Sequence, residues 1–522
     1  MNDVELVIFT VSLAVFVSLI FGGALGFYVR RLRIGNIARR KAILEVLRAP
    51  EGSPRSFVGF FHPYCNAGGG GELVLWTAIQ HIQATEQDVV CIVYTGDLDA
   101  AKDEILAKVN MRFNIQLNPQ SLHFVYLKRR KWVEGKSWPR FTLAGQSFGS
   151  MVLAWEAMSN LIPDLFIDTM GYAFSFHVVR TLGGIPVAAY VHYPTISSDM
   201  LARVASRKAW HTNTGAIASS SVLSYAKLAY YYVFAFFYAQ ALRKATFLMV
   251  NSTWTKNHVD AILVSTNSWL ATFTGFLLDP FGKNYKIKTR TVFPPCDTTK
   301  IARQSLEGRE RIILSDHPTQ IRALRELLDL RPDWRDGPMK VQLVLLGSVR
   351  NDEDAGRVAA LEHLVDELGL QDNVQFELNA PHVVLQSALA NASVGISTMV
   401  DEHFGINIVE YMAAGLIPVV NESGGPLLDI VVPVNDEPTG FHATDAASYA
   451  RALVEALSLS PEADLAMRTR ARRHAVQKFS VPEFTKGWGM GGWTDWRRSI
   501  RAQKAQAKAA VEQKKGLEQK KD

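Results

Sequence analysis

Short apolar runs alternate with segments of helical length along most of this 522-residue chain. The first series of such runs comprises Phe57 to Phe61, Val89 to Tyr94, His123 to Leu127, Leu165 to Asp168, Val187 to Val191 and Phe247 to Val250. A second series, after Pro294 and Pro295, comprises Ile312 to Leu314, Val341 to Leu346, Val374 to Glu377, Val394 to Ser397 and Ile417 to Val420. Parallel strands need crossover helices, so this alternation is typical of a doubly wound parallel sheet.

Two series predict an α/β protein with two Rossmann-like domains. The ligands of such sheets bind at the carboxyl ends of the strands, so we expect a site in a central cleft that the two domains face. The predicted layout is a membrane anchor over residues 1–33, an N-terminal domain over 50–295, a C-terminal domain over 296–480, and a terminal helix with a basic tail over 481–522.

An uncharged run of 24 residues, Leu6 to Val29, precedes the first domain. As a helix it would extend about 36 Å, enough to cross a hydrocarbon core of about 30 Å. Acidic residues precede the run and basic residues, beginning with Arg30 and Arg31, follow it. This pattern differs from that of a cleaved signal peptide and predicts a retained anchor, with the following chain in the cytosol. A buried core helix is the alternative.

A second apolar segment, residues 222–242, is rich in Tyr and Phe and contains Lys227. Its aromatic content favours a helix lying at the headgroup level of a membrane. A buried core helix and a second membrane span remain alternatives. The residues from Leu263 to Arg290 are long for a connection and predict an insertion.

The net charge of +6 arises from 56 basic and 50 acidic residues. Residues 30–48 and 497–522 each carry an excess of +6, so the rest of the chain is acidic overall. A nucleic-acid enzyme would carry its positive charge on the folded body, so no nucleic-acid partner is expected. The three cysteines form no CxxC pair, which argues against a zinc site or a disulfide framework.

Four consecutive glycines, Gly68, Gly69, Gly70 and Gly71, follow the first predicted strand and precede a predicted helix from Leu73 to Gln83. Glycines allow backbone amides to approach an anion closely, and the following helix start favours negative charge. We therefore predict a phosphate cradle here, with a simple tight turn as the alternative. A P-loop is excluded because no Lys-Ser/Thr pair follows.

In the second series, the segment from Asp401 to Glu410 follows a predicted strand. Glu402 and Glu410 are eight residues apart, so in a helix beginning near Phe404 both can face one ligand. Their carboxylates could accept hydrogen bonds from sugar hydroxyls, and the amides at the helix start suit a phosphate. Solvated helix carboxylates are the alternative. Asn421 to Pro426 adds another glycine-bearing turn.

The two glutamates around His403-Phe404-Gly405, with Ser423-Gly424-Gly425-Pro426, resemble the donor site of retaining glycosyltransferases of family 4, which have the two-domain GT-B fold. The segments Phe60 to Ala67, Ile167 to Phe174 and Tyr190 to Ser197 resemble, more specifically, the eukaryotic GDP-mannose-dependent α-1,2-mannosyltransferases of the endoplasmic reticulum. These enzymes extend the dolichol-diphosphate-linked precursor of N-glycans on the cytosolic face of that membrane.

The resemblance implies roles for individual residues. Glu410 would bind the ribose of GDP, Glu402 the mannose, and His192 would lie near the reacting sugar. Phe404, Gly405, Ile406, Gly424 and Gly425 would hold the donor, and Gly68 to Gly71 would lie near the diphosphate and the acceptor. Asp168 and Asp199 are further candidates, with capping or structural roles as the alternative. GDP-mannose is then a substrate, and no cofactor or metal is expected.

The resemblance also implies that the N-terminal domain binds the acceptor and the C-terminal domain binds GDP-mannose. The expected products carry the fourth and fifth mannoses. The membrane of the endoplasmic reticulum and other mannosyltransferases of the pathway are the expected partners.

One departure from the family pattern lies after Ser315, where a loop with an Arg and a Lys that clamp the leaving diphosphate is expected. Here Ser315 is followed directly by Asp316-His317, and Arg311 lies at the wrong end of its strand to substitute. Leu73 and Leu427 replace an expected Arg and Lys. A catalytically impaired GT-B scaffold is therefore an alternative interpretation, and a GT-B nucleotide-sugar epimerase is a second one.

Overall fold

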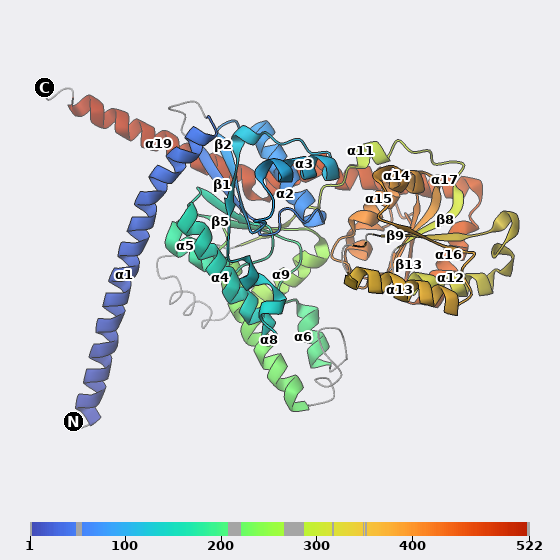
Figure 1. Cartoon of the computed structure of the whole chain (residues 1–522), viewed down its shortest axis with the longest axis horizontal. Coiled ribbons are helices and arrows are strands. Elements are labelled where there is room, and N and C mark those ends of the chain that lie inside the picture. The colour runs from blue at the N-terminus through green and yellow to red at the C-terminus, as the bar shows by residue number, and fades with distance from the viewer. Residues whose placement is uncertain are drawn as a thin grey trace. The chain divides into compact units, whose positions relative to one another are not determined.

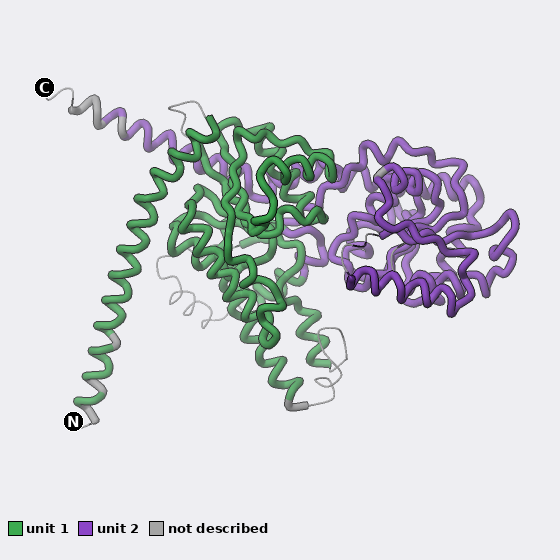
Figure 2. Tube along the Cα trace, in the orientation of Figure 1, with its two compact units in different colours: residues 1–249, 258–289 green, residues 250–257, 290–522 purple. Residues whose placement is uncertain are grey.

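The computed structural model describes residues 3–48, 55–206, 221–265, 287–315, 318–347, 349 and 352–518. The predicted insertion lies largely outside the described residues, as do Asp316 and His317. The chain divides into two compact units, which Figure 2 colours separately. Unit 1 comprises residues 1–249 and 258–289, and unit 2 comprises residues 250–257 and 290–522.

Unit 1 contains a sheet of seven strands in the order β3-β2-β1-β4-β5-β6-β7. The strands are β1 (Ser56–Phe61), β2 (Val89–Thr95), β3 (Leu122–Tyr126), β4 (Leu165–Asp168), β5 (Val187–Val191), β6 (Phe247–Val250) and β7 (Thr289–Thr291). The helices that connect or follow them are α2 (Gly70–Thr85), α3 (Lys102–Phe113), α4 (Thr142–Asn160), α5 (Ser175–Gly183), α6 (Ser198–Ala205), α8 (Ser221–Leu242) and α9 (Thr253–Ser265). The first residues of α9, up to Asn257, belong to unit 2. β1, β2 and β4 are buried on both faces, which explains their continuous apolar sequences.

Unit 2 contains a sheet of six strands in the order β10-β9-β8-β11-β12-β13. These are β8 (Glu310–Ser315), β9 (Gln342–Gly347), β10 (Val374–Leu378), β11 (Ala392–Ser397), β12 (Ile417–Asn421) and β13 (Phe441–Ala443). Its helices include α11 (Thr298–Ile301), α12 (Pro318–Leu330), α13 (Asp352–Glu367), α14 (His382–Asn391), α15 (Ile406–Ala414), α16 (Ala446–Leu457), α17 (Pro461–Phe479), α18 (Val481–Trp488) and α19 (Thr494–Glu518). The pairings of β8 to β13 are parallel.

The prediction of two parallel α/β sheets is therefore confirmed. The sequence did not predict β7 and β13, which are only three residues long each.

The first helix, α1 (Asp3–Val46), contains the predicted anchor and continues beyond it without a break (Figure 1). It is the one helix among the described residues that is long and apolar enough to cross a membrane. Among its described side chains, the large apolar ones from Leu6 to Phe27 are exposed, except for the half-buried Leu25. Farther along, Asn36 exchanges hydrogen bonds with the backbone of Ile162, and Arg40 forms a two-pronged ion pair with Asp164. The second half of α1 is thus an integral part of unit 1.

The aromatic helix predicted at residues 222–242 is α8, and its two faces differ. Phe234 and Tyr238 are buried in unit 1, where both contact the ring of Phe174. By contrast, Tyr225 and Tyr232 are 73% and 58% exposed. One face of α8 is therefore a core face, and the other remains open.

Candidate active site

The four predicted cradle glycines lie across the start of α2. Gly68 has φ +86°, Gly69 is the N-cap, and Gly70 and Gly71 are the first two helical residues. Helical residues in these first positions have no acceptor within the helix for their amides. The turn therefore presents the amides of Gly70 and Gly71 at the carboxyl end of β1.

A buried polar network supports this turn. Glu72 accepts the Gly69 N–H at 2.5 Å through Oε2 and contacts His62 Nε2 at 3.0 Å through Oε1. His62 Nδ1 lies 2.8 Å from Thr169 Oγ1, at the end of β4. Burial alone would raise the pKa of Glu72, but His62 and the Gly69 N–H more than offset this effect and lower it. The Gly69 N–H therefore binds a carboxylate of the protein itself.

His192, the predicted catalytic histidine, follows β5 and faces the same turn. A Cβ atom built on Gly71 would lie 3.6 Å from His192 Nε2 and 4.0 Å from His62 Cε1. The fold therefore brings His192 and the glycine turn together.

Asp168 ends β4 beside these groups and is completely buried. Its Oδ1 accepts the Met170 N–H at 3.0 Å, whereas its Oδ2 has no hydrogen-bond partner among the described residues. Burial raises the pKa of this carboxyl to about 7, although nearby backbone amides oppose the shift. Asp199, the second of these candidates, instead pairs with Arg203 and accepts from Ser197 on the helix start of α6.

The predicted donor residues of unit 2 lie at the carboxyl ends of β11 and β12. α15 begins at Ile406 rather than near Phe404, because Gly405, with φ +104°, forms its N-cap. Glu402 therefore lies in the preceding loop and Glu410 lies inside the helix. Phe404 is 4% exposed and packs on Phe293 and Phe479. Its ring therefore belongs to the core, and only its backbone is part of the loop surface.

Gly424 and Gly425 hold this loop by close backbone contact. The Gly425 N–H donates to the Glu402 carbonyl at 2.7 Å. A Cβ atom at Gly424 would lie 2.2 Å from that carbonyl oxygen, and one at Gly425 would lie 2.6 Å from the carbonyl of His403. The Asp401 N–H also donates to Ser423 Oγ at 2.7 Å. The spacing of the two motifs in the sequence thus reflects direct packing of one turn on the other.

Residues at the start of α9, which the sequence did not indicate, complete this arrangement. The ring of Trp254 lies 5.3 Å from that of His403. Thr253 donates from its N–H and its hydroxyl to the carboxylate of Asp429, at 2.7 and 2.6 Å. Asp429 belongs to the helical turn η6 (Pro426–Ile430) that follows Gly425. No local sequence signal connects residues 253–254 with residues 403 and 429.

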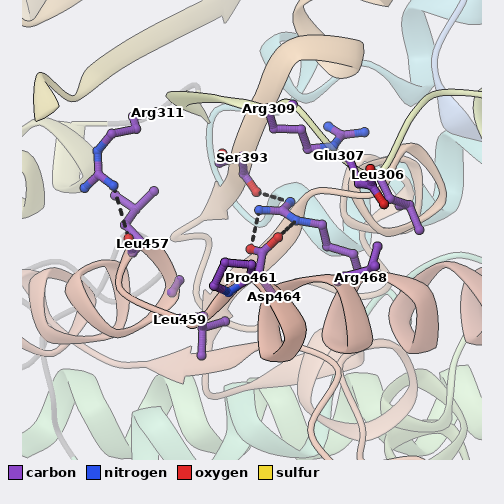
Figure 3. A pocket seen from close by; sticks show the side chains of 13 residues that line it. Leu306, Glu307, Arg309, Arg311, Ser393, Leu457, Leu459, Pro461, Asp464 and Arg468 are labelled. Atoms are coloured by element: carbon purple, nitrogen blue, oxygen red, sulfur yellow. Dashed lines mark hydrogen bonds and ion pairs between the residues drawn. The ribbon is translucent and has the colours of Figure 1, made fainter. Parts of the chain in front are cut away.

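A cavity of about 470 Å³ in unit 2 lies at the opposite edge of the sheet, where β8 and β11 begin (Figure 3). Arg468 donates to the carbonyls of Ser393 and Gly415 and pairs with Asp464. Arg311 donates to the Leu457 carbonyl and lies over the ring of Trp334. These guanidinium groups serve the fold, and Arg311 is remote from the carboxyl end of β8, as the sequence indicated.

Within the described ranges, no three His, Cys, Asp or Glu residues are grouped so that they could hold a metal ion. The absence of a metal requirement stays a prediction.

Solved structures share this architecture. A sucrose-phosphate synthase from Thermosynechococcus elongatus has a TM-score of 0.53 at 18% identity and covers 86% of this chain and 100% of its own. A UDP-forming α,α-trehalose-phosphate synthase from Burkholderia xenovorans has a TM-score of 0.56 at 14% identity, with coverages of 84% and 98%. The two parallel sheets are thus those of the GT-B glycosyltransferase fold.

Two family models match successive parts of the chain. Residues 55–263 match the ALG11 mannosyltransferase N-terminus, and residues 319–474 match glycosyl transferases group 1. The chain is a glycosyltransferase by both matches.

Curated relatives make the assignment more specific. A protein from Xenopus laevis is 43% identical over 458 residues, covering 85% of this chain and 88% of its own. Others from Neurospora crassa and Homo sapiens are each 39% identical and cover 93% and 86% of this chain, and 95% and 88% of their own. All three are named GDP-Man:Man(3)GlcNAc(2)-PP-Dol alpha-1,2-mannosyltransferase. This chain belongs to that family of mannosyltransferases.

Proposed function

We propose that this protein transfers mannose from GDP-mannose to a mannose 2-hydroxyl of a dolichol-diphosphate-linked oligosaccharide, with retention of the α configuration. Adding the fourth and fifth mannoses of the N-glycan precursor fits the substrate in the relatives' names. The observation that carries this proposal is the loop of Glu402 to Gly405 seated on Gly424 and Gly425, in a chain of this family.

In the proposed reaction, the bond from the anomeric carbon to the leaving phosphate breaks on the face where the acceptor oxygen bonds. The proton of the acceptor hydroxyl passes to the leaving phosphate oxygen. Glu402 binds the transferred mannose, Glu410 the ribose, and the amides at the start of α15 bind the diphosphate. His192 and the amides of Gly70 and Gly71 line the acceptor side. No covalent protein nucleophile and no metal are required.

We further propose a single membrane span in α1, in the endoplasmic reticulum, with both units on the cytosolic face. The exposed apolar run before Phe27 and the basic residues after it support this orientation. In intact microsomes, added protease should then cleave near His192 and near Glu402 alike. Protection of either region would contradict it. Association with other mannosyltransferases of the pathway also remains a proposal.

The direct test is an assay of the purified full-length chain with GDP-mannose and a lipid-linked acceptor that ends in mannose. We expect products extended by one and two mannoses that an α-1,2-specific mannosidase removes. Turnover without acceptor would instead favour an epimerase. No turnover, restored by an Arg- and Lys-containing loop between Ser315 and Asp316, would favour the impaired scaffold, which the comparisons do not support.

Two variants separate the proposed roles of the glutamates. Glu410→Ala should mainly raise the KM for GDP-mannose, and Glu402→Ala should mainly lower kcat. The loss of one hydrogen-bonded carboxylate costs about 1–3 kcal/mol, or roughly tenfold to a hundredfold in kcat/KM. Unchanged kinetics in both variants would remove the donor-site assignment.

A further inference from the structure

The end of the apolar run in α1 is held against unit 1 by a contact with α4. Phe27 is 69% exposed, and Tyr28, the next residue, accepts a hydrogen bond from Trp155 Nε1 at 2.8 Å. The hydroxyls of Tyr28 and Ser159 are 3.2 Å apart. Tyr and Trp concentrate where a bilayer meets water. Trp155 therefore marks the part of unit 1 that lies at the bilayer surface when α1 spans.

The segment of residues 128–141 begins directly beside Trp155. The guanidinium of Arg129 lies 4.8 Å from the ring centroid of Trp155. The backbone amides of Lys128 and Arg129 both donate to Glu156, one residue farther along α4. The segment then continues through two short 3₁₀ turns, Arg130–Val133 and Gly135–Ser137, to the start of α4.

The segment combines aromatic and positive side chains. Trp132, Trp138 and Phe148 contact one another with ring centroids 5.9 to 6.4 Å apart. Phe148 is 52% exposed, and Phe141 is 71% exposed although it touches Tyr230 of α8. A buried core would not leave these rings open to water.

Residues 128–141 contain six basic residues and one acidic residue, Glu134. Arg130 is paired with Asp97, and Lys136 is paired with Glu134. Four basic residues form no ion pair within the described parts of the chain: Lys128, Arg129, Lys131 and Arg140. Of these, Lys128, Lys131 and Arg140 are exposed. The segment therefore presents unneutralised positive charge next to open aromatic rings.

We infer that residues 128–141 form a bilayer-contacting surface that binds the phosphate-bearing headgroups of anionic phospholipids in the membrane that holds α1. Interfacial aromatic rings together with unpaired Lys and Arg suit this partner. The contact at Trp155 places the segment at the same level as the end of the apolar run. The charge count of the whole chain conceals this surface, because acidic residues elsewhere compensate it.

This surface is connected to the glycine turn of the proposed active site. Arg130 pairs with Asp97, whose Oδ2 accepts the Asn66 N–H at 2.9 Å. The guanidinium of Arg130 also lies 5.0 Å from the ring centroid of Tyr64. Headgroup binding would therefore stabilise the segment from Asn66 to the glycine turn. We expect this stabilisation to change the KM for the lipid-linked acceptor.

The first test measures contact and does not depend on the proposed function. The full chain would carry a fluorophore on Lys136→Cys, in nanodiscs containing headgroup spin-labelled lipid. The native cysteines are buried, so they should not react. The matched control is Met111→Cys, at a side chain that is 81% exposed. Met111 belongs to α3, a helix on the side of unit 1 away from the N-terminus (Figure 1). Strong quenching at 136 and weak quenching at 111 is expected. Equal quenching at both positions would overturn the proposal.

The second test rests on the proposed function and measures kinetics in nanodiscs of neutral lipid with or without anionic lipid. Anionic lipid should lower the acceptor KM about threefold to tenfold in the wild type. The variant K128Q/K131Q/R140Q should lose this response, whereas the control K300Q/R303Q/R473Q, whose residues are exposed on unit 2, should keep it. A full response in the first variant would overturn the proposal.

The same variants assayed in detergent distinguish the source of the phosphate. If K128Q/K131Q/R140Q raises the acceptor KM equally in detergent and in both kinds of nanodisc, the segment binds the diphosphate of the acceptor instead, and the bilayer proposal fails. Absence of mannosyl transfer in every sample would count against the proposed function but would leave the quenching result valid.

Discussion

Two glycine-bearing turns at the carboxyl ends of parallel strands are stabilised in different ways. In unit 1 the turn at Gly69 depends on a buried carboxylate and imidazole, Glu72 and His62. In unit 2 the loop at Glu402 depends mainly on Gly424 and Gly425, which allow two backbones to touch. The stability of the first turn should therefore depend on the charge of its side chains and hence on pH. The stability of the second should depend on the side-chain volume at Gly424 and Gly425.

The largest effect is expected from Gly424→Ala. The added Cβ would lie 2.2 Å from the Glu402 carbonyl oxygen, at a backbone φ of +64° that disfavours alanine. We expect kcat/KM to fall by more than about a hundredfold, since a shift of about 1 Å in a positioning group can cost that much.

Two control variants separate volume from backbone strain. Gly308→Ala has a similar positive φ of +72° with nothing within 4 Å, and Gly356→Ala on α13 has open space and no such φ. Both should retain activity within a few-fold. Comparable losses in Gly308→Ala and Gly424→Ala would show that strain rather than contact explains the effect.

Glu72→Gln should come next. It replaces the buried carboxylate that bonds His62 and the Gly69 N–H by a neutral amide, and the loss of a buried hydrogen bond to a charged group typically costs about 1.5–3 kcal/mol. The melting temperature of the purified chain should fall accordingly. Because the pKa of Glu72 is lowered by folding, its stabilisation is present at neutral pH and disappears as the pH falls through the acid range. The difference from wild type should therefore shrink at acidic pH, and a constant difference would argue against an ionised Glu72.

Asp168→Asn tests a second buried carboxyl beside the same turn, whose pKa is raised rather than lowered by folding. Its folded pKa of about 7 lies above the ordinary carboxyl value of 3.8, so wild-type stability falls as the pH rises between those values. Asn cannot ionise and should remove roughly 1–4 kcal/mol of that dependence. The melting temperature of the variant relative to wild type should rise between pH 5 and pH 8. A parallel pH profile for the two proteins would mean that Asp168 is ionised throughout.

The smallest effect should come from Thr253→Val, which removes the hydroxyl bond to Asp429 but keeps the backbone bond. The expected loss is about 1 kcal/mol, seen as a roughly fivefold higher KM for GDP-mannose. Thr253→Ser restores the hydroxyl and should recover wild-type kinetics. Failure of that rescue would assign the effect to packing.

The fold could be predicted from the sequence because buried parallel strands are continuous apolar runs, as at Val89 to Thr95 and Ile417 to Asn421. Boundaries were less accurate, since α15 begins at Ile406, two residues after the start near Phe404 that was assumed from the sequence. The glutamates and glycines of unit 2 could be recognised because their spacing follows from one turn packing on the next.

Other parts of the site could not be predicted, because they depend on contacts between distant segments. Trp254 approaches His403, and His62 approaches Thr169, only after the sheets form. The bilayer-contacting role of the basic segment at 128–141 could not be predicted either, because the sequence does not show that Arg129 lies beside Trp155 at the end of the apolar run.

The unbroken course of α1 determines how this protein can meet its substrate. With α1 in a bilayer, no joint separates the span from the sheet, because Asn36 and Arg40 fasten the same helix to the end of α4 and the start of β4. Unit 1 then moves with its anchor as one body, at a constant height above the lipid. Encounter with a lipid-borne acceptor becomes a search in two dimensions, in which the number of molecules per unit area replaces concentration in solution.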